Sequence, residues 1–496
     1  MKALVIGSGV AGLATSIRLA TQGYAVEVYE ANSYPGGKLT VFEQDGFRFD
    51  AGPSLFTLPH LVDELFALAG ENPRDHFNYQ RSEVACHYFF EDGVDLMAWS
   101  DPAKFAQEVE EKVGVPAATI KEFFQHSQYI YDTTTPVFLE RSLHRFSSYL
   151  HRDVIKGIAR IFSLDLFTTM DKSNRKRLKE PHLVQLFNRF ATYNGSNPFR
   201  APGVLNTIPH LEHHLGTWFP EGGMHAITQS LYALAQRLGV RFHFNQKVTQ
   251  ILTSDQKVLG IEVGGKQVAS SLVVSNMDIV PTYRQLMPTQ PAPEKTLQQE
   301  RSSSAIIFYW GIQHQFSELQ LHNIFFSADY QEEFRQMFED KTVGDDPTVY
   351  IHVSSRMQPE DAPEGCDNWF VMVNAPSDQG QDWDALIPRV RQNVLRKLSR
   401  LLKTDIEPLI KTESLLEPRL IRSKTSSFGG ALYGSASNDR MAAFLRHANF
   451  SGRLSGLYFC GGSVHPGGGI PLCLLSARIV SDLVQSDLPQ PQTLAS

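Results

Sequence analysis

A glycine motif set between two short strands, within the first 30 residues, restricts the fold of this chain more than any other feature. Residues 3–6 form an apolar run that is typical of a buried parallel strand. The motif G-x-G-x-x-G follows at once, at Gly7, Gly9 and Gly12, and opens a helical pattern. A second strand then ends at Glu30. Such glycines let a pyrophosphate approach the N-terminus of the helix, and the carboxylate can bind ribose hydroxyls. The whole order predicts a dinucleotide-binding site.

Length, charge and cysteine content narrow the class of protein further. A chain of 496 residues exceeds what one hydrophobic core usually supports, so we expect two domains. The net charge of −7 argues against a nucleic-acid partner, because no overall basic balance is available to neutralise phosphates. The 4 cysteines lie far apart and predict neither a metal site nor a redox pair, as in a cytoplasmic protein with reduced thiols. No signal-peptide pattern precedes the first strand and no run of about 18 apolar residues occurs, so we expect neither secretion nor a membrane span.

Three consecutive glycines near the C-terminus raise the question of what comes close to the main chain there. Gly467, Gly468 and Gly469 stand between two prolines, and an apolar stretch of small residues suited to a helix follows. Glycine is used where a ligand meets the backbone or where φ is positive. A plain loop is the alternative interpretation of such a cluster. The choice between the two depends on the rest of the chain.

Three segments of the chain together resemble the FAD-binding segments of the carotenoid (phytoene-type) desaturase family of FAD-dependent oxidoreductases. The first continues beyond Glu30 through ANSYPGGKL and GFRFDAGPSLF, the second covers residues 216–278, and the third is LYFCGGSVHPGGGIP. They occur in the order found in that family. The stretches at 188–212 and 424–435 are similar to the same family, nearest the branch of the 1-hydroxycarotenoid 3,4-desaturases.

The resemblance implies an α/β fold in which a discontinuous Rossmann-like FAD-binding domain is joined to an α+β substrate domain, as in amine oxidases and phytoene desaturases. The FAD-binding domain would combine residues 1–70, 211–290 and 450–496. The substrate domain would combine residues 71–210 and 291–449.

The second part of the implied substrate domain carries its own pattern of strands and one long helix. Strand-like runs occur at 303–312, 348–354 and 368–375, and a helical pattern extends from about 383 to 402. These runs predict a sheet with helices across it. Such a sheet could form the wall of an apolar cavity for a C40 polyene.

Residue by residue, the resemblance implies FAD contacts along all three segments. The acid at Glu30 would bind the ribose, the backbone at Val248 would lie near the adenine, and the strand ending near Asn276 would return under the cofactor. The isoalloxazine ring would lie flat on the glycine turn, with the last helix, from Ile470, directed at its pyrimidine edge. Lys38 stands where many members carry arginine. The predicted cofactor-binding residues are Gly7, Gly9, Gly12, Glu30, Gly36, Gly37, Lys38, Gly52, Pro53, Ser54, Val248, Gly461, Gly467, Gly468, Gly469 and Ile470.

The activity implied by the resemblance is FAD-dependent desaturation of a C40 carotenoid, in which a hydride and a proton leave adjacent carbons and the conjugated polyene lengthens. The nearest branch implies the 3,4-bond of a 1-hydroxycarotenoid. No catalytic base is assigned, since Arg189, Tyr193 and Glu212 are candidates by position alone. His465 fits a structural imidazole as well as a catalytic one. The electron acceptor, oxygen or a quinone, stays open.

Three alternatives remain beside this interpretation. Phytoene desaturases act on phytoene itself, and carotenoid cis–trans isomerases need reduced flavin without net oxidation. Rab GDP dissociation inhibitors share the general fold and bind isoprenoids without redox chemistry. The complete glycine pattern and Glu30 favour a working FAD site over this last alternative.

Residues 141–179 form a strongly basic stretch in an acidic chain. They contain 10 lysines or arginines against 3 aspartates, a local balance of +7, interleaved with apolar residues at helical spacing. Such a stretch can lie on an anionic bilayer surface, and a solvated helix face is the alternative. Because a carotenoid dissolves in the membrane, we expect a cytoplasmic enzyme that associates peripherally with a membrane surface through this stretch.

Overall fold

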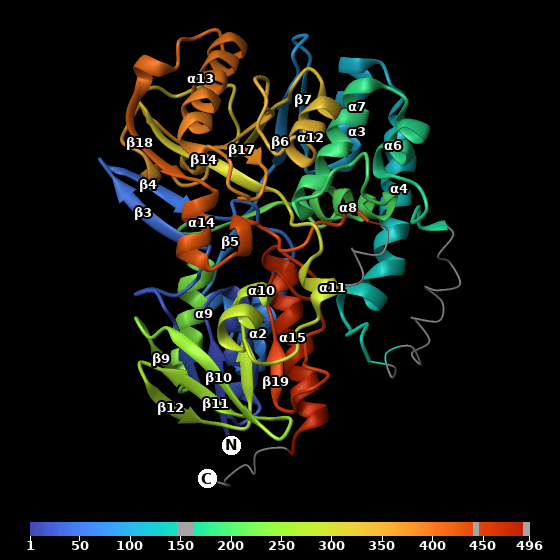
Figure 1. Ribbon diagram of the computed structural model, residues 1–496. Coiled ribbons are helices and arrows are strands. Elements are labelled where there is room, and N and C mark those ends of the chain that lie inside the picture. Colours follow the sequence, from blue (N-terminus) through green and yellow to red (C-terminus); the bar gives the residue numbers. More distant parts are fainter. Residues whose placement is uncertain (146–147, 149–162, 440–445, 490–496) are drawn as a thin grey trace.

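The computed structural model describes residues 1–145, 148, 163–439 and 446–489, and Figure 1 shows two regions stacked along the long axis of the molecule. The lower region in that view contains a parallel sheet, and the upper region contains a larger mixed sheet with helices beside it. Of the basic stretch at 141–179, residues 146–147 and 149–162 lie outside the described residues. Among the described residues, no helix is long and apolar enough to cross a membrane.

The lower region is built on five parallel strands in the spatial order β19-β13-β1-β2-β9. These strands are β1 (Lys2–Ile6), β2 (Ala25–Tyr29), β9 (Arg241–His243), β13 (Val273–Ser275) and β19 (Leu457–Phe459). At the centre, Leu4 of β1 pairs with Val273 on one side and with Glu27 on the other. Parts of the chain that are far apart in sequence therefore share one sheet.

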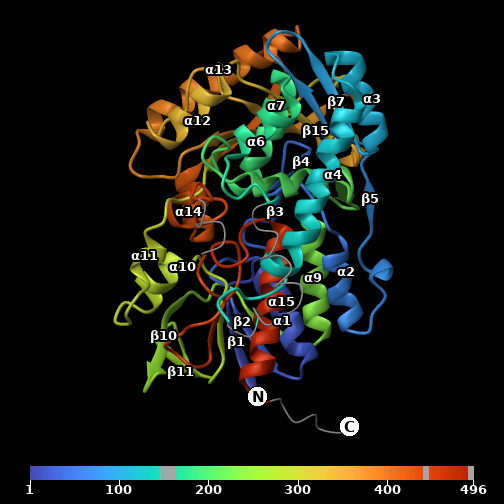
Figure 2. The same cartoon turned by 90° about the vertical axis from the view of Figure 1, so that its right-hand side faces the viewer.

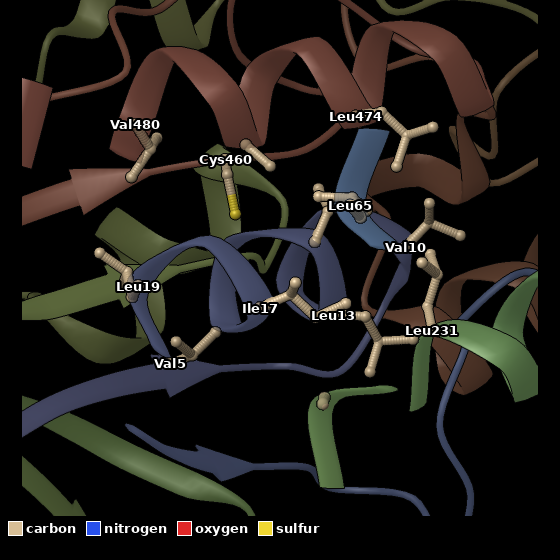
Figure 3. Packing of buried hydrophobic residues seen from close by; sticks show 14 of the residues in the cluster. Val5, Val10, Leu13, Ile17, Leu19, Leu65, Leu231, Cys460, Leu474 and Val480 are labelled. Atoms are coloured by element: carbon tan, nitrogen blue, oxygen red, sulfur yellow. The ribbon is translucent and has the colours of Figure 1, made fainter. Parts of the chain in front are cut away.

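Both faces of this sheet are covered, which explains why β1 is apolar at successive positions. Val5 points into a cluster formed with the helices of one face, whereas Leu4 and Ile6 point into the cluster on the other face. Figure 3 shows the first cluster, where α1 with Leu13 and Ile17 packs beside α15. The helices of this face are α1 (Val10–Thr21), α2 (His60–Leu68), α9 (His225–Arg237) and α15 (Ile470–Asp487). The other face is covered by an antiparallel sheet of β10 (Val248–Ser254), β11 (Lys257–Val263) and β12 (Lys266–Ala269).

The upper region contains a seven-stranded sheet in the order β18-β14-β17-β16-β15-β6-β7. Its pairs are antiparallel except β15 with β6, which run parallel. The strands are β6 (Val84–Phe89), β7 (Asp95–Trp99), β14 (Ser304–Ile312), β15 (His322–Phe325), β16 (Val349–His352), β17 (Asp367–Ala375) and β18 (Ile410–Leu416). The long helix α13 (Trp383–Leu401) covers one face, where its apolar side chains meet those of β14 and β17.

A group of helices stands beside the β6–β7 end of this sheet (Figures 1 and 2). They are α3 (Pro102–Val113), α4 (Ala117–Thr134), α6 (Met170–Leu178), α7 (Pro181–Asn188), α8 (Ile208–His213) and α12 (Tyr330–Phe338). Short elements complete the described fold: β3 (Thr40–Gln44) with β4 (Phe47–Ala51), β5 (Tyr79–Arg81) with β8 (Trp218–Pro220), α10 (Ile279–Pro281), α11 (Glu294–Leu297) and α14 (Pro418–Thr425).

The predicted α/β fold class is confirmed, and the strand and helix patterns agree closely with the observed elements. The helix expected at 383–402 is α13. The strands β6 and β7, within residues 84–99, were not predicted from the sequence. They complete the upper sheet by pairing with β15, a strand far along the chain.

Buried histidines make the stability of this fold dependent on pH. His213 has no exposed surface and lies among the rings of Phe105 and Phe124, at centroid distances of 5.0 and 4.7 Å. Burial lowers the pKa of His213 from 6.5 to about 3. The unfolded chain therefore binds more protons than the folded chain between these two values, and stability falls as the pH drops below 6.5.

We predict that His213→Leu reduces the loss of unfolding free energy between pH 6.5 and 5 by about 1 to 2 kcal/mol, because this variant has no imidazole to protonate. Urea denaturation at both pH values measures the difference. His60→Leu, at an exposed position of α2, is the matched control and keeps the wild-type slope. An equal slope in His213→Leu and wild type would contradict the prediction.

Candidate active site

One cavity of about 720 Å³ joins the two regions of the molecule. Its lower end lies at the carboxyl edge of the parallel sheet, where Gly7, Glu30, Asn276 and Gly461 follow β1, β2, β13 and β19. Ligands of open α/β sheets bind at this edge. Its upper end is mostly apolar, with a wall formed by the upper sheet and by the residues around α8. This wall includes Val204, Leu205, Ile208, Ile307, Ile324, Phe370 and Met372.

The N-terminal glycines leave room for the main chain and for one side chain from a distant strand. A Cβ atom at Gly12 would lie 2.2 Å from the carbonyl oxygen of Gly7. At Gly9 it would lie 2.8 Å from Nδ2 of Asn276. Helix α1 begins here without a side-chain cap and without an acid in its first turn, so its N-terminus is suited to a phosphate. The family resemblance implies only the end of a strand near Asn276, whereas the structure places its side chain against the glycine turn.

Glu30 is held at the edge of the cavity by hydrogen bonds that orient its carboxylate. It accepts hydrogen bonds from the backbone N–H and the hydroxyl of Ser8, at 2.8 and 2.9 Å, and from the backbone N–H of Asn32 at 2.9 Å. Its own carbonyl accepts from the backbone N–H of Gln246 at 2.8 Å, which brings Val248 to the same end of the cavity. The charged side chains lining this end are Glu30, Lys38, Lys247 and Lys424. Their formal excess of positive charge suits an anionic ligand.

The three consecutive glycines serve three different purposes. A Cβ at Gly468 would lie 2.7 Å from Cα of Tyr433, so the turn and the main chain at Tyr433 approach each other closely. A Cβ at Gly467 would lie 3.2 Å from Nε of Arg446, and φ at Gly467 is +140°. Gly469 has open space around it and a φ of +111°, and α15 begins immediately after it without a side-chain cap.

The predicted cofactor residues divide into a group that lines the cavity and two that lie behind it. Gly12 and Gly467 are not part of the lining, and they serve the packing of the two turns. The lining contains Gly7, Gly9, Glu30, Gly36, Gly37, Lys38, Gly52, Pro53, Ser54, Val248, Gly461, Gly468, Gly469 and Ile470.

Arg446 holds the C-terminal glycine turn in place, a role that no sequence pattern indicated. Its side chain is 2 % exposed, and its Nη1 donates to the carbonyls of Tyr433 (2.7 Å) and Gly462 (3.2 Å). Its Nη2 donates to Asn194 Oδ1 at 2.9 Å and to the carbonyl of Ser435 at 2.8 Å. Burial lowers the pKa of Arg446 to about 10, so the guanidinium stays charged at neutral pH.

Lys38 and Ser54 meet the cavity where its two ends join. The Lys38 amine donates to the carbonyl of Leu432 at 3.3 Å, and burial lowers its pKa although Asp278 opposes the shift. The Ser54 hydroxyl lies 2.7 Å from the Tyr350 phenol, which lies 2.7 Å from Nδ1 of His322. Burial lowers the pKa of His322 well below 6.5, so this row of polar groups is uncharged.

The three candidates for the catalytic base, Arg189, Tyr193 and Glu212, form one buried cluster. Arg189 donates from Nη1 to the Tyr193 phenol at 2.9 Å and from Nη2 to the Tyr88 phenol at 2.5 Å. The Tyr193 phenol donates to Glu212 Oε2 at 2.5 Å, and Arg189 Nη2 lies 3.4 Å from Glu212 Oε1. Arg189 and Tyr193 line the cavity, whereas Glu212 lies behind them. Burial raises the pKa of Glu212, and the Arg189 guanidinium opposes that rise.

His465 also lines the cavity, and its imidazole binds the main chain of the cavity wall. Its Nε2 lies 2.9 Å from the carbonyl of Arg141 and binds it as a donor. Burial lowers the pKa of His465 to about 4, which keeps the ring neutral.

The residues present fit a dinucleotide that carries a flat ring. Two uncapped helix N-termini, at Val10 and Ile470, meet one cavity. Between them lies main chain without side chains at Gly461 and Gly468. An acid at the far end, Glu30, suits a ribose. Main chain that carries no side chain lets a planar ring lie against it, and a helix N-terminus favours negative charge on that ring.

We predict that Gly468→Ala weakens flavin binding by about tenfold or more, because the methyl group forces the turn and Tyr433 apart. The ratio of flavin absorbance to protein absorbance in the purified protein, followed by titration with added flavin, measures the effect. Gly452→Ala is the matched control, since a Cβ there meets nothing within 4 Å. A Gly468→Ala protein that keeps a full complement of flavin would show that the ring does not lie on this turn.

Comparisons with known proteins agree with this fit. The chain is 51% identical over 483 residues to a 1-hydroxycarotenoid 3,4-desaturase from Flavobacterium sp. (strain P99-3), with 97% of this chain and 99% of the relative covered. It is 32% identical over 495 residues to a 4,4'-diapolycopene oxygenase from Methylomonas sp., with 98% of each covered. Among solved structures, wild-type putrescine oxidase bound to putrescine gives a TM-score of 0.63 at 14% identity, covering 98% of this chain and 99% of that one.

The family comparison extends over nearly the whole chain. The model of the family described as flavin containing amine oxidoreductase matches residues 10–485, which include both uncapped helix N-termini and the C-terminal glycine turn. This chain therefore belongs to the flavin containing amine oxidoreductase family and is a flavin-dependent oxidoreductase.

Proposed function

We propose that this protein is a carotenoid desaturase that uses FAD to oxidise a CH–CH bond of a C40 carotenoid and so extends its conjugated polyene. The observation that carries the proposal is the continuous cavity, which extends from the glycine turn at Gly468 into a chamber lined mostly by apolar side chains. The identity of 51% to a 1-hydroxycarotenoid 3,4-desaturase over 97% of the chain supports the same substrate class and the 3,4-bond.

The arrangement of the site supports FAD rather than a shorter flavin. The glycine turn that suits the ring and the Glu30 carboxylate that suits a ribose lie at opposite ends of the lower part of the cavity, with the α1 N-terminus between them. A ring, a pyrophosphate and an adenosine ribose fill these three places, and a mononucleotide fills two of them.

The protein's own part in the reaction is to position the bond and to exclude water. FAD, when bound, supplies the hydride acceptor. The apolar wall around Ile324 and Phe370 holds a hydrocarbon chain by burial, at about 0.8 kcal/mol for each CH₂ group removed from water. The proton that leaves the adjacent carbon passes to water or to a base that we do not assign, and oxygen or a quinone reoxidises the flavin.

We further propose a cytoplasmic protein that associates peripherally with a membrane surface. The support is chemical: a C40 hydrocarbon is dissolved in lipid, and residues 141–179 combine basic and apolar side chains. A second function, oxygenation of a carotenoid, is supported by the identity of 32% to a 4,4'-diapolycopene oxygenase. Oxygen in the product separates this alternative from desaturation.

The prediction is that the purified protein carries yellow flavin that bleaches without oxygen when a carotenoid is supplied in liposomes. The polyene absorption should move to longer wavelength at the same time, because each new double bond lengthens the conjugated system. Visible spectroscopy follows both changes, and mass spectrometry of the product should show a loss of two hydrogens.

Other results of the same experiment would identify one of the alternative functions. Flavin that stays oxidised while the carotenoid changes its isomeric form would replace desaturation by isomerisation. A protein that binds carotenoid but no flavin, even after FAD is added, would be an isoprenoid-binding protein. Turnover of phytoene but not of a hydroxylated carotenoid would identify the protein as a phytoene desaturase.

A further inference from the structure

A charged cluster stands at the wall of a cavity that is otherwise mostly apolar. Arg189 is 5% exposed and Glu212 1%, yet Arg189 and its neighbour Tyr193 contribute to the lining of the substrate end. Charged side chains are rarely buried at such a wall unless they are paired or serve a ligand. Arg189 and Glu212 are paired with each other, but Nε of Arg189 has no hydrogen-bond partner among the described residues, so this donor can serve a ligand.

The Tyr193 phenol keeps the capacity for one more hydrogen bond. Its hydroxyl donates to Glu212, and its oxygen accepts from Arg189. A phenol oxygen has one donor and two acceptor positions, so one acceptor position is left. Because Tyr193 lines the cavity, that position is available to a hydroxyl group of a bound molecule.

Neighbouring groups fix the guanidinium in one orientation. The rings of Tyr88, Phe190 and Tyr193 lie 5.1, 4.6 and 4.9 Å from the Arg189 carbon Cζ. The Tyr88 phenol accepts from Nη2 at 2.5 Å. These contacts make Tyr88 and Glu212 positioning residues, which present Arg189 and Tyr193 to the cavity in a fixed geometry.

The cluster lies close to the turn that suits the flavin ring. Arg189 and Tyr193 belong to the short helical turn η5 (Arg189–Asn194), which ends at Gly195. A Cβ at Gly195 would lie 2.9 Å from Cδ2 of Tyr433, and a Cβ at Gly468 would lie 2.7 Å from Cα of the same residue. A single residue, Tyr433, thus separates the end of η5 from the glycine turn.

We infer that Arg189 and Tyr193 bind a hydroxyl group at the end of the carotenoid and so select hydroxylated substrates. This inference rests on the proposed function. A hydrocarbon end at this place leaves the Tyr193 acceptor position and the Arg189 Nε–H without a partner, which costs binding, whereas a hydroxyl donates to the phenol oxygen and accepts from Nε. A hydroxyl on carbon 1 and a bond between carbons 3 and 4, as in the name of the 51% identical relative, are two carbons apart. One cluster beside the flavin turn can therefore hold the hydroxyl while the bond lies over the ring.

The test compares a hydroxylated carotenoid with the same carotenoid carrying hydrogen in place of the hydroxyl, both in liposomes. Tyr193→Phe removes the phenol, and Arg189→Lys keeps the charge but loses the planar fork. Tyr309→Phe is the matched control, since the Tyr309 phenol is buried in β14 without a hydrogen-bond partner and does not line the cavity. Thermal unfolding of each variant verifies that it folds. The readouts are kcat/KM and, separately, binding to protein whose flavin has been chemically reduced beforehand and cannot accept a hydride, measured by quenching of tryptophan fluorescence without oxygen.

We expect the wild type to favour the hydroxylated carotenoid by about tenfold or more in kcat/KM and in binding. In Tyr193→Phe and Arg189→Lys this preference should fall by about tenfold, because kcat/KM and binding decrease more for the hydroxylated carotenoid than for the parent. Tyr309→Phe should keep the wild-type ratio. Equal losses on both carotenoids would give the cluster a purely structural role and overturn the inference.

Different results would contradict the proposed desaturase activity and the proposed recognition of a hydroxyl group. If both carotenoids are oxidised with equal kcat/KM by the wild type, desaturation stands and hydroxyl recognition is wrong. If neither is oxidised but the hydroxylated one binds more tightly, and Tyr193→Phe abolishes this preference, hydroxyl recognition stands and the proposed reaction is wrong. Equal binding without oxidation overturns both.

Discussion

Close contact of main chain with main chain, at the carboxyl edge of the parallel sheet, is the constraint on which the rest of the structure depends. A Cβ at Gly12 would come within 2.2 Å of the Gly7 carbonyl, and a Cβ at Gly52 within 1.9 Å of the Lys38 carbonyl. The chain can cross itself this closely only where both side chains are absent or point away. The wall of the cavity at this edge is consequently made of main chain and of two helix N-termini, which suits a planar ring and an anionic phosphate.

The lower and the upper end of the cavity differ in the charge of the side chains that line them. The lower end has three lysines and Glu30 in its lining, and the carboxylate is fixed by three hydrogen bonds from Ser8 and Asn32. The upper end contains Arg189, paired with Glu212, and a row of neutral groups from Ser54 to His322. An anionic cofactor and an apolar substrate can therefore occupy one continuous space without either meeting the surroundings suited to the other.

Local patterns in the sequence were enough to predict the elements that depend on neighbouring residues. The β1–α1–β2 order and α13 follow from apolar periodicity and glycine positions within short windows. Pairings over long distances were not accessible in this way. The strands β6 and β7 carry no sign that their partner is β15, and Asn276 and Arg446 look like ordinary polar residues until the fold brings glycines from other segments against them. The candidate cluster was named from the family resemblance, whereas its hydrogen bonds and its position beside Tyr433 came from the structure.

The pairing of Arg189 with Glu212 also matters for the proposed chemistry. Removal of a hydride leaves positive charge on the carbon chain, and an isolated guanidinium beside it would raise the barrier through repulsion. Glu212 lies 3.4 Å from the guanidinium and shares the Tyr193 phenol with it, so the cluster presents a dipole with little net charge. A dipole of this kind can orient a hydroxyl while opposing the developing positive charge far less than a lone cation would. The acid behind the wall is therefore as necessary to the arrangement as the two residues that face the cavity.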